Sequence, residues 1–185
     1  MSVSYFVVIR GPLGVGKSTI AEKVARTLGA EHLSIDQILE EKGLEEWDED
    51  RISLKSFLRA NTFAVDAARA LLEKGKPVVF DGNFYWKPAI DDLLGRLEFP
   101  HLVFTLEAPL DVCIERDRHR PRTAPGKEPR AGESLGEEAT RQVYAMVVQV
   151  PYGIAIDATG STEDTTKAVL DRIEVDLAHA ATRSL

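Results

Sequence analysis

RGPLGVGKST, residues 10–19 of this 185-residue chain, decides the fold. The stretch matches the pattern G-x-x-x-x-G-K-[ST], with Gly11, Gly16, Lys17 and Ser18 at the required positions. A short apolar run precedes it and a helical pattern follows it, which is the setting in which this pattern forms a phosphate-binding loop. The glycines let backbone N–H groups face an anion, and the N-terminus of the following helix adds partial positive charge. We therefore predict that the loop binds the phosphates of a nucleoside triphosphate.

Two side chains of the loop have predicted chemical roles. Lys17 is expected to reach the β- and γ-phosphates and to act in catalysis, and the hydroxyl of Ser18 is expected to ligate Mg²⁺. The predicted cofactors are therefore ATP and Mg²⁺. The residues of the loop that we expect to contact the nucleotide are Gly11, Leu13, Gly14, Val15, Gly16, Lys17, Ser18 and Thr19.

The composition, 44% hydrophobic and 29% charged residues, is that of an ordinary globular protein, and its length suits one domain over residues 1–185. The longest apolar runs are strand-sized, so we expect no membrane-spanning segment. The N-terminus lacks the pattern of a signal peptide, and the single cysteine, Cys113, has no partner for an internal disulfide. These features predict a cytoplasmic protein in which Cys113 is a small, partly buried apolar residue.

The net charge of −7 argues against a protein that coats nucleic acid with a basic surface. The charge is uneven, because the window from Arg116 to Arg130 holds six cations and two anions, a charge of +4 that leaves −11 elsewhere. The part from His119 to Gly136 is too long and too polar for a passive connection. We therefore predict a lid over approximately residues 116–136.

Strand patterns alternate with helical patterns along the chain. The expected strands are Tyr5–Ile9, Glu31–Ile35, Pro77–Phe80, His101–Leu106 and Tyr152–Ile156. The expected helices are Ser18–Leu28, Gln37–Lys42, Ser53–Lys74, Lys87–Leu97, Leu110–Asp117, Glu137–Val150 and Thr165–Ala180. The acidic stretch Glu45–Asp50 is interpreted as a solvated surface connection, with Trp47 anchored in it. This alternation predicts an α/β fold with a doubly wound, five-stranded parallel sheet of the P-loop NTPase type and a lid segment.

Acidic residues follow the expected strands at the edge of the sheet where ligands bind. Asp36, at the end of what we take to be the neighbouring strand, is the candidate general base for an acceptor hydroxyl; a helix cap is the alternative. Asp81 follows an apolar run, as in a Walker B site, so it is predicted to hold Mg²⁺ or to contact substrate, with a structural cap as the alternative. Residues assigned to the substrate site are Asp36, Arg59, Asp81 and Asn83.

Arg116 and Arg120 are four residues apart, on one face of a helix that runs that far. Such a pair can place one guanidinium against a base and direct the other at phosphate oxygens, and Arg120 is the candidate for catalysis. The alternative is a solvated basic patch. The four histidines have no metal-ligand spacing, and we assign them no role.

Together, the segments 11–19, 33–36, 78–81 and 105–109 and the Arg-rich run 116–120 resemble the P-loop small-molecule kinases. The most similar group holds polynucleotide 5′-hydroxyl kinase, chloramphenicol phosphotransferase and zeta-toxin-like kinases. This resemblance implies a mobile lid, a base at Asp36 and lid arginines that clasp the nucleotide. It also implies that the turn from Asp157 to Ser161 borders the adenine, which adds Thr159 and Gly160 to the nucleotide site. Shikimate kinases have Gly-Gly-Gly where this chain has residues 81–83, Asp-Gly-Asn, which argues against shikimate as the acceptor.

The leading functional hypothesis is an ATP-dependent kinase that phosphorylates a hydroxyl of a small molecule, with Asp36 as the base. One alternative is a 5′-hydroxyl polynucleotide kinase, whose strand end the positive lid would guide. Another is a regulatory ATPase without an acceptor, although no switch loop is recognisable in the sequence.

Overall fold

The computed structural model describes residues 4–49, 51–122 and 131–182. A five-stranded sheet, parallel throughout, forms its centre. The strands run in the order β2 (Glu31–Ser34), β5 (Val78–Gly82), β1 (Phe6–Arg10), β6 (His101–Glu107) and β7 (Ile154–Asp157). The predicted α/β fold with a five-stranded parallel sheet is confirmed.

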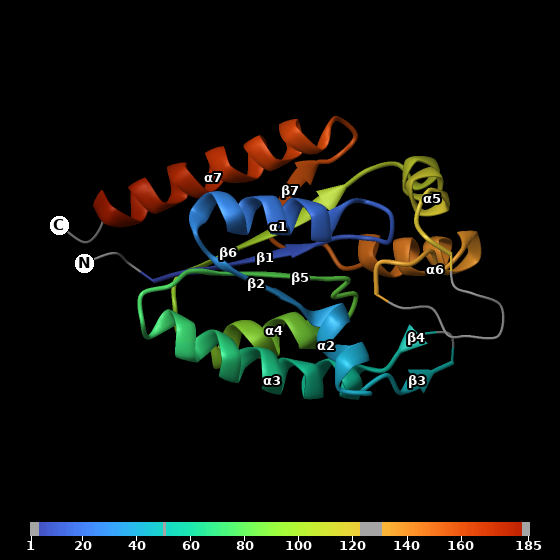
Figure 1. Ribbon diagram of the computed structural model, residues 1–185, viewed down its shortest axis with the longest axis horizontal. Helices are drawn as coiled ribbons and strands as arrows, with labels where there is room; N and C mark the ends of the chain where they lie inside the picture. Colours follow the sequence, from blue (N-terminus) through green and yellow to red (C-terminus); the bar gives the residue numbers. More distant parts are fainter. Residues whose placement is uncertain (1–3, 50, 123–130, 183–185) are drawn as a thin grey trace.

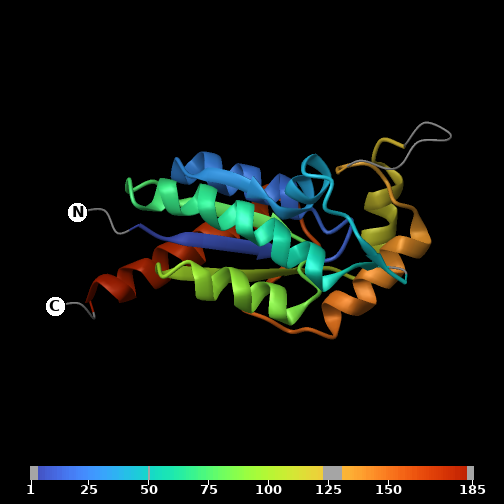
Figure 2. The same ribbon diagram turned by 90° about the horizontal axis from the view of Figure 1, so that it is seen from below.

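Helices cover both faces of the sheet, as Figure 1 shows. One face packs against α1 (Lys17–Leu28) and α7 (Thr162–Thr182), and the other packs against α3 (Leu54–Leu72) and α4 (Lys87–Arg96). Figure 2, seen from below, has α3 and α4 in front of the sheet. Because successive strand residues point to opposite faces, β1 sends Phe6 and Val8 into one core and Val7 and Ile9 into the other.

The remaining elements gather beyond the carboxyl ends of the strands, on the right-hand side of Figure 1. They are α2 (Ile35–Glu41), the antiparallel hairpin of β3 (Trp47–Asp48) and β4 (Arg51–Ile52), α5 (Leu110–Arg118) and α6 (Glu137–Val148). They surround the end of the sheet at which parallel α/β folds bind their ligands.

The second strand ends earlier than predicted, and this changes the setting of Asp36. β2 stops at Ser34, whose hydroxyl accepts a hydrogen bond from the N–H of Gln37 at 3.4 Å, so Ile35 begins a helix. Asp36 therefore lies in the first turn of α2, and Ser34 is the residue that caps that helix. The sheet order also places β5 between β2 and β1, so the prediction that Asp36 ends the strand next to the loop is wrong.

Two other predictions need correction. Asp81 lies inside β5, which continues to Gly82, rather than after the strand. The acidic stretch around Trp47 forms part of a hairpin, and the Trp47 side chain is 65% exposed rather than anchored. Within the described ranges, no helix is long and apolar enough to cross a membrane.

Candidate active site

The phosphate loop connects β1 to α1 through two glycines that no other residue replaces easily. Gly16 caps α1 with φ of 99°, and Gly14 has φ of 76°, so both lie in the left-handed region that favours glycine. A Cβ atom at Gly14 would also lie 2.0 Å from the carbonyl oxygen of Cys113 in α5. The loop is therefore in direct contact with α5, the helix that leads into the predicted lid. Cys113 itself is buried, and burial raises the pKa of its thiol to about 11, which disfavours the thiolate form.

Lys17 and Asp36 meet across the loop. Nζ of Lys17 lies 3.8 Å from Oδ2 of Asp36, with 4% of the lysine side chain and 25% of the aspartate side chain exposed. Burial lowers the pKa of Lys17, and burial together with the charge of Asp81 raises the pKa of Asp36, although Lys17 opposes that rise. A carboxylate with a raised pKa accepts a proton more readily, which suits a general base.

Asp81 is fully buried and holds a central position between two other polar side chains. Its Oδ2 accepts a hydrogen bond from the Ser18 hydroxyl at 2.6 Å, and its Oδ1 lies 2.7 Å from Nε2 of His32. Burial acts to raise the pKa of Asp81, but the bonds to His32 and Ser18 and the charge of Lys17 lower it overall. Asp81 is therefore held as a carboxylate.

The pair of Ser18 and Asp81 fits the predicted Mg²⁺ site. A hydroxyl and a carboxylate are hard oxygen ligands, which Mg²⁺ prefers, and the cation usually completes its octahedron with water and substrate phosphates. In the part of the chain that the structure describes, no group of three or more His, Cys, Asp or Glu residues could hold a metal by itself. A cation at Ser18 and Asp81 would therefore depend on the nucleotide for further ligands.

His32 is a residue of this site that the sequence analysis missed. Burial acts to lower its pKa, but the hydrogen bond and charge of Asp81 raise it overall. The signal was present in the alternation of β2, because His32 lies on the same face as Ser34, which pairs with Asp81 across the sheet. The sequence alone does not show that β2 pairs with β5, and without that pairing His32 cannot be placed beside Asp81.

The residues predicted to bind substrate come together in part. The backbone N–H of Asn83 donates to Oδ1 of Asp36 at 3.5 Å, so Asn83 and Asp36 are joined beside Asp81. Arg59, in contrast, donates to Glu46 at 2.7 Å and is half exposed. The structure therefore places Arg59 in an ion pair on α3 and gives it no bond to the other three substrate residues.

A cavity of about 400 Å³ is lined by part of the predicted nucleotide site. The predicted residues that do not line it are Gly11, Leu13, Lys17, Ser18 and Thr159. Nη1 of Arg116 donates to the carbonyl oxygens of Ala158 at 2.7 Å and Val15 at 3.4 Å, and Nη2 donates to those of Thr159 and Gly160 at 3.3 Å. Arg116 thus braces the phosphate loop against the turn after β7. The other lining residues are Gly14, Gly16, Thr19, Ile20, Arg120, Ser161, Thr162 and Thr165. Gly11 and Leu13 are packed inward beneath the loop.

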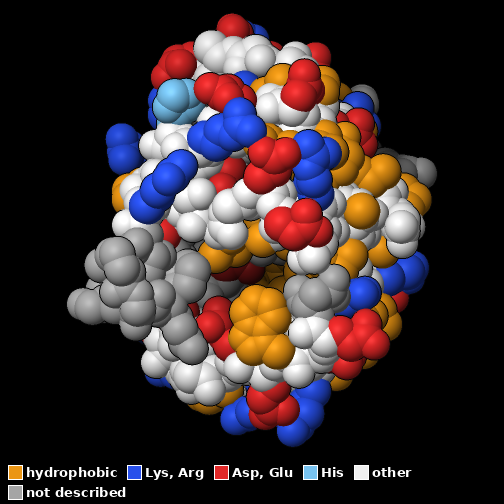
Figure 3. All heavy atoms as spheres, turned by 90° about the vertical axis from the view of Figure 1, so that its right-hand side faces the viewer, with side chains coloured by type: hydrophobic (Ala, Val, Ile, Leu, Met, Phe, Trp, Pro, Cys, Tyr) orange, Lys and Arg blue, Asp and Glu red, His pale blue; other side chains and the backbone are white. Residues whose placement is uncertain are grey.

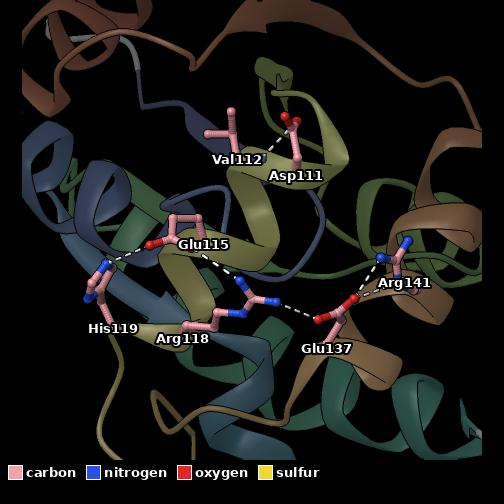
Figure 4. Close-up of polar contacts among 7 residues, drawn as sticks. All are labelled: Asp111, Val112, Glu115, Arg118, His119, Glu137 and Arg141. Carbon is pink, nitrogen blue, oxygen red and sulfur yellow. Dashed lines mark hydrogen bonds and ion pairs between the residues drawn. The ribbon is translucent and has the colours of Figure 1, made fainter.

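The two described ends of the predicted lid are tied together at its base. Oδ2 of the buried Asp117 accepts hydrogen bonds from the Ser134 hydroxyl at 2.7 Å and from the Gly136 N–H at 3.3 Å. Nη2 of Arg118 donates to Glu137 at 2.7 Å, which joins α5 to α6 in the exposed network of Figure 4. Residues 123–130, the middle of the predicted lid, lie outside the described residues.

The lid region also reaches across to α2. The backbone N–H of Ala131 donates to Oε2 of Glu40 at 2.7 Å. Figure 3 looks at this end of the molecule, where the surface is hollowed and acidic and hydrophobic side chains surround the opening. The hollow lies on the side of the molecule toward which the carboxyl ends of the strands point (Figure 1 and Figure 3).

The comparisons with known proteins agree with this arrangement. The sequence profile of a family described as an AAA domain matches residues 6–144, about three quarters of the chain. The chain is 27% identical over 169 residues to a putative adenylate kinase of Thermococcus kodakarensis. This alignment covers 90% of this chain and 84% of the relative.

Solved kinase structures have the same fold. A gluconokinase from Sinorhizobium meliloti superposes with a TM-score of 0.70 at 18% identity, covering 97% of each chain. A sugar kinase from a Janibacter species superposes with a TM-score of 0.69 at 17% identity, covering 93% of this chain and 95% of the other. The expected resemblance to P-loop small-molecule kinases is thereby confirmed at the level of the fold.

Proposed function

Because the chain belongs to the AAA-domain family and has the fold of a P-loop kinase, we propose that it transfers the γ-phosphate of ATP to a hydroxyl of a small molecule. The observation that carries the proposal is Asp36, a carboxylate with a raised pKa that lies 3.8 Å from the phosphate-loop Lys17. A hydroxyl acceptor must lose its proton as its oxygen attacks phosphorus, and Asp36 is the group in place to take it.

The remaining residues have positioning and electrostatic roles in this reaction. Lys17 stabilises the charge that develops on the transferred phosphoryl group, and Arg120, at the edge of the nucleotide cavity, approaches the same phosphates. Arg116, Thr159 and Gly160 border the nucleotide base. Ser18 and Asp81 would hold Mg²⁺, which would supply charge neutralisation at the phosphate oxygens. Asn83 and Asp36 face the acceptor.

A nucleoside monophosphate is the second candidate acceptor, because two curated relatives are named putative adenylate kinases. A phosphate acceptor is already an anion and needs no carboxylate to remove a proton, whereas it does need cations around it. Of the cations considered for the site, Arg59 is engaged by Glu46 away from Asp36, and the phosphate-loop Lys17 faces Asp36. The hydroxyl acceptor fits this charge pattern better.

The 5′-hydroxyl of a nucleic acid is a weaker candidate. The main support for this candidate was the excess of positive charge between Arg116 and Arg130. In the structure, however, Arg118 pairs with Glu115 and Glu137, and Arg120 lies 3.9 Å from Asp117. Carboxylates thus offset part of the positive charge in the described part of the lid. Lys127 and Arg130 belong to the residues that the structure does not describe.

An ATP-consumption screen tests the proposal. The acceptors are sugars, sugar acids, nucleosides, aminoglycoside-type antibiotics, AMP and 5′-hydroxyl oligonucleotides, and one arm has no acceptor. We expect rapid ATP consumption with a hydroxyl-bearing small molecule and its loss in Asp36→Asn, while Asp66→Asn, an exposed change on α3, behaves as the unchanged protein. Fast consumption with AMP that survives Asp36→Asn would instead establish a nucleotide acceptor, and fast consumption without acceptor would establish an ATPase.

A further inference from the structure

Arg10, the last residue of β1, is fully buried, and among the described residues its hydrogen-bond partners are uncharged groups, with its Nε left unpartnered. Its Nη1 donates to Oγ1 of Thr105 at 3.1 Å and to the carbonyl oxygen of Val150 at 2.7 Å. Its Nη2 donates to the carbonyl oxygens of Phe84 and Val147, both at 3.3 Å. The guanidinium therefore joins the start of the phosphate loop to three other segments: β6, the turn after β5 and the end of α6.

A buried cation without a carboxylate partner is costly unless oriented dipoles replace the lost water. Here the partners include the carbonyl of Val147 in the last turn of α6 and that of Val150 just beyond its end, where the helix dipole is negative. Burial still lowers the pKa of Arg10 to about 10. The planar fork of arginine is suited to this role because its two ends reach acceptors in different directions.

The turn that Arg10 holds has an unusual backbone. Phe84 is fully buried and has φ of 44°, which is rare for a residue other than glycine. Gly82 is pressed against its neighbours, since a Cβ atom there would lie 3.1 Å from the Cβ of Ile35 in α2 and from the Phe84 ring. Such a conformation persists only when its surroundings hold it in place.

The same turn carries the N–H of Asn83, which donates to the carboxylate of Asp36. We propose that Arg10 is a positioning residue for Asp36: by holding the Phe84 carbonyl against the end of α6, it fixes the Asn83 N–H that orients the base. The consequence for phosphoryl transfer rests on the proposed function, whereas the effect on the turn does not. Arg10 thus links the acceptor side of the cleft to the helix that follows the lid.

Hydrogen exchange of the turn tests the positioning without knowledge of the acceptor. The variants are Arg10→Lys, whose ammonium cannot span both sets of acceptors, and Thr105→Val, which removes one acceptor but leaves the bonds to Phe84 and Val147. In the same samples, exchange of α3 amides reports global unfolding, and binding of a fluorescent ATP analogue with Mg²⁺ reports the nucleotide site. Arg10→Gln serves as a second variant if Arg10→Lys is unstable.

In Arg10→Lys we expect the amides of residues 83–85 to exchange at least about tenfold faster, with α3 and analogue affinity changed less than about threefold. Thr105→Val should leave the turn within about threefold of the unchanged protein. Equal exchange in Arg10→Lys and the unchanged protein, or equal acceleration in both variants, would overturn the proposal.

A kinetic arm uses any acceptor that the screen identifies. Arg10→Lys should lower kcat by at least about tenfold while analogue affinity is retained, because the base and not the nucleotide is misplaced. If the turn of residues 83–85 exchanged faster in Arg10→Lys but kcat were unchanged, the proposed role of Arg10 in phosphoryl transfer would be overturned. If the screen identified no acceptor, that result would count against the proposed function. The hydrogen-exchange result would still decide whether Arg10 holds the turn.

Discussion

The phosphate loop and the acceptor side of the same cleft differ in how many parts of the chain they need. The loop is one continuous stretch whose shape depends on glycine conformations at positions 14 and 16. The acceptor side is assembled from α2, β5 and the turn that follows it, which contribute Asp36, Asp81 and Asn83. Substitutions in the loop should therefore affect nucleotide binding, whereas substitutions at Asp36 should affect transfer and spare that binding.

The largest effect is expected at Lys17. Replacing Lys17 with alanine removes the cation that we propose contacts the transferring phosphate, so phosphoryl transfer should fall to the background rate. Transfer from radiolabelled ATP measures this. Lys23→Ala is the matched control, since Lys23 lies on the same helix but pairs with Glu163 at the surface. Near-normal transfer by the Lys17 variant would refute the assignment of the loop.

The second effect separates the two sides of the cleft. Asp36→Asn keeps the shape of the side chain but cannot accept the proton, so kcat should fall by roughly 10²–10⁴ while affinity for an ATP analogue is retained. A fall in analogue affinity with unchanged kcat would place Asp36 in the nucleotide site.

The pH dependence of kcat sharpens this prediction. The proposed base, Asp36, would work as a carboxylate, so activity should rise with pH through the pKa of Asp36 and be lost on acidification. Because that pKa is raised above the usual value of about 3.9, the loss should begin at a higher pH than an ordinary carboxylate gives. The pH profile of Asp36→Asn should lack this acid limb.

His32→Gln should weaken Mg²⁺ binding. The imidazole orients Asp81, and changes to residues that orient a metal ligand typically cost about 10–100-fold in affinity. A Mg²⁺ titration of analogue binding measures the effect. His119→Gln, an exposed change on the lid side, is the control and should have no effect. An unchanged Mg²⁺ requirement in His32→Gln would refute the link between His32 and the metal.

Arg116→Met should weaken ATP-analogue binding by about tenfold, because it removes charged hydrogen bonds that join the phosphate loop to the turn after β7. A titration of the analogue checks this value. If binding were unchanged, the turn would hold its place without Arg116.

The smallest effect is expected at Arg118, on the same helix. Its ion pairs with Glu115 and Glu137 are exposed and screened by solvent, so Arg118→Met should leave the free energy of unfolding almost unchanged. Denaturant unfolding measures this, and analogue binding should not change. A larger loss would mean that the network in Figure 4 holds the base of the lid.

Most of the fold was predictable because its signals are local. The apolar runs of β1, β5 and β6 and the loop motif each lie within a few consecutive residues. The end of β2 was not predicted, because the Ser34 cap competes with an apolar pattern that continues through Ile35. The hairpin of β3 and β4 was also missed, since two residues per strand give no periodicity.

The site was predictable where a motif assigns a fixed role to a residue, as the phosphate-loop pattern does for Lys17 and Ser18. His32 and Arg10 were missed because their roles depend on partners far along the chain, Asp81 for the first and Phe84, Val147 and Val150 for the second. Arg59 was assigned to substrate, but the nearby Glu46 engages it, and only the path of the chain before α3 brings that carboxylate within reach.

Arg10 and Arg116 both take main-chain carbonyl oxygens as acceptors. A carbonyl oxygen is present whatever side chain its residue carries, so the partners of the two arginines are free to vary in sequence as long as the backbone keeps its path. Substitutions should therefore be tolerated less well at the two arginines than at the residues whose carbonyl oxygens they bond. In a scan of all single substitutions, we expect few replacements to be tolerated at the two arginines and many to be tolerated at the residues that supply their acceptors. The hydrogen bonds of these arginines should therefore produce little covariation between positions in related sequences.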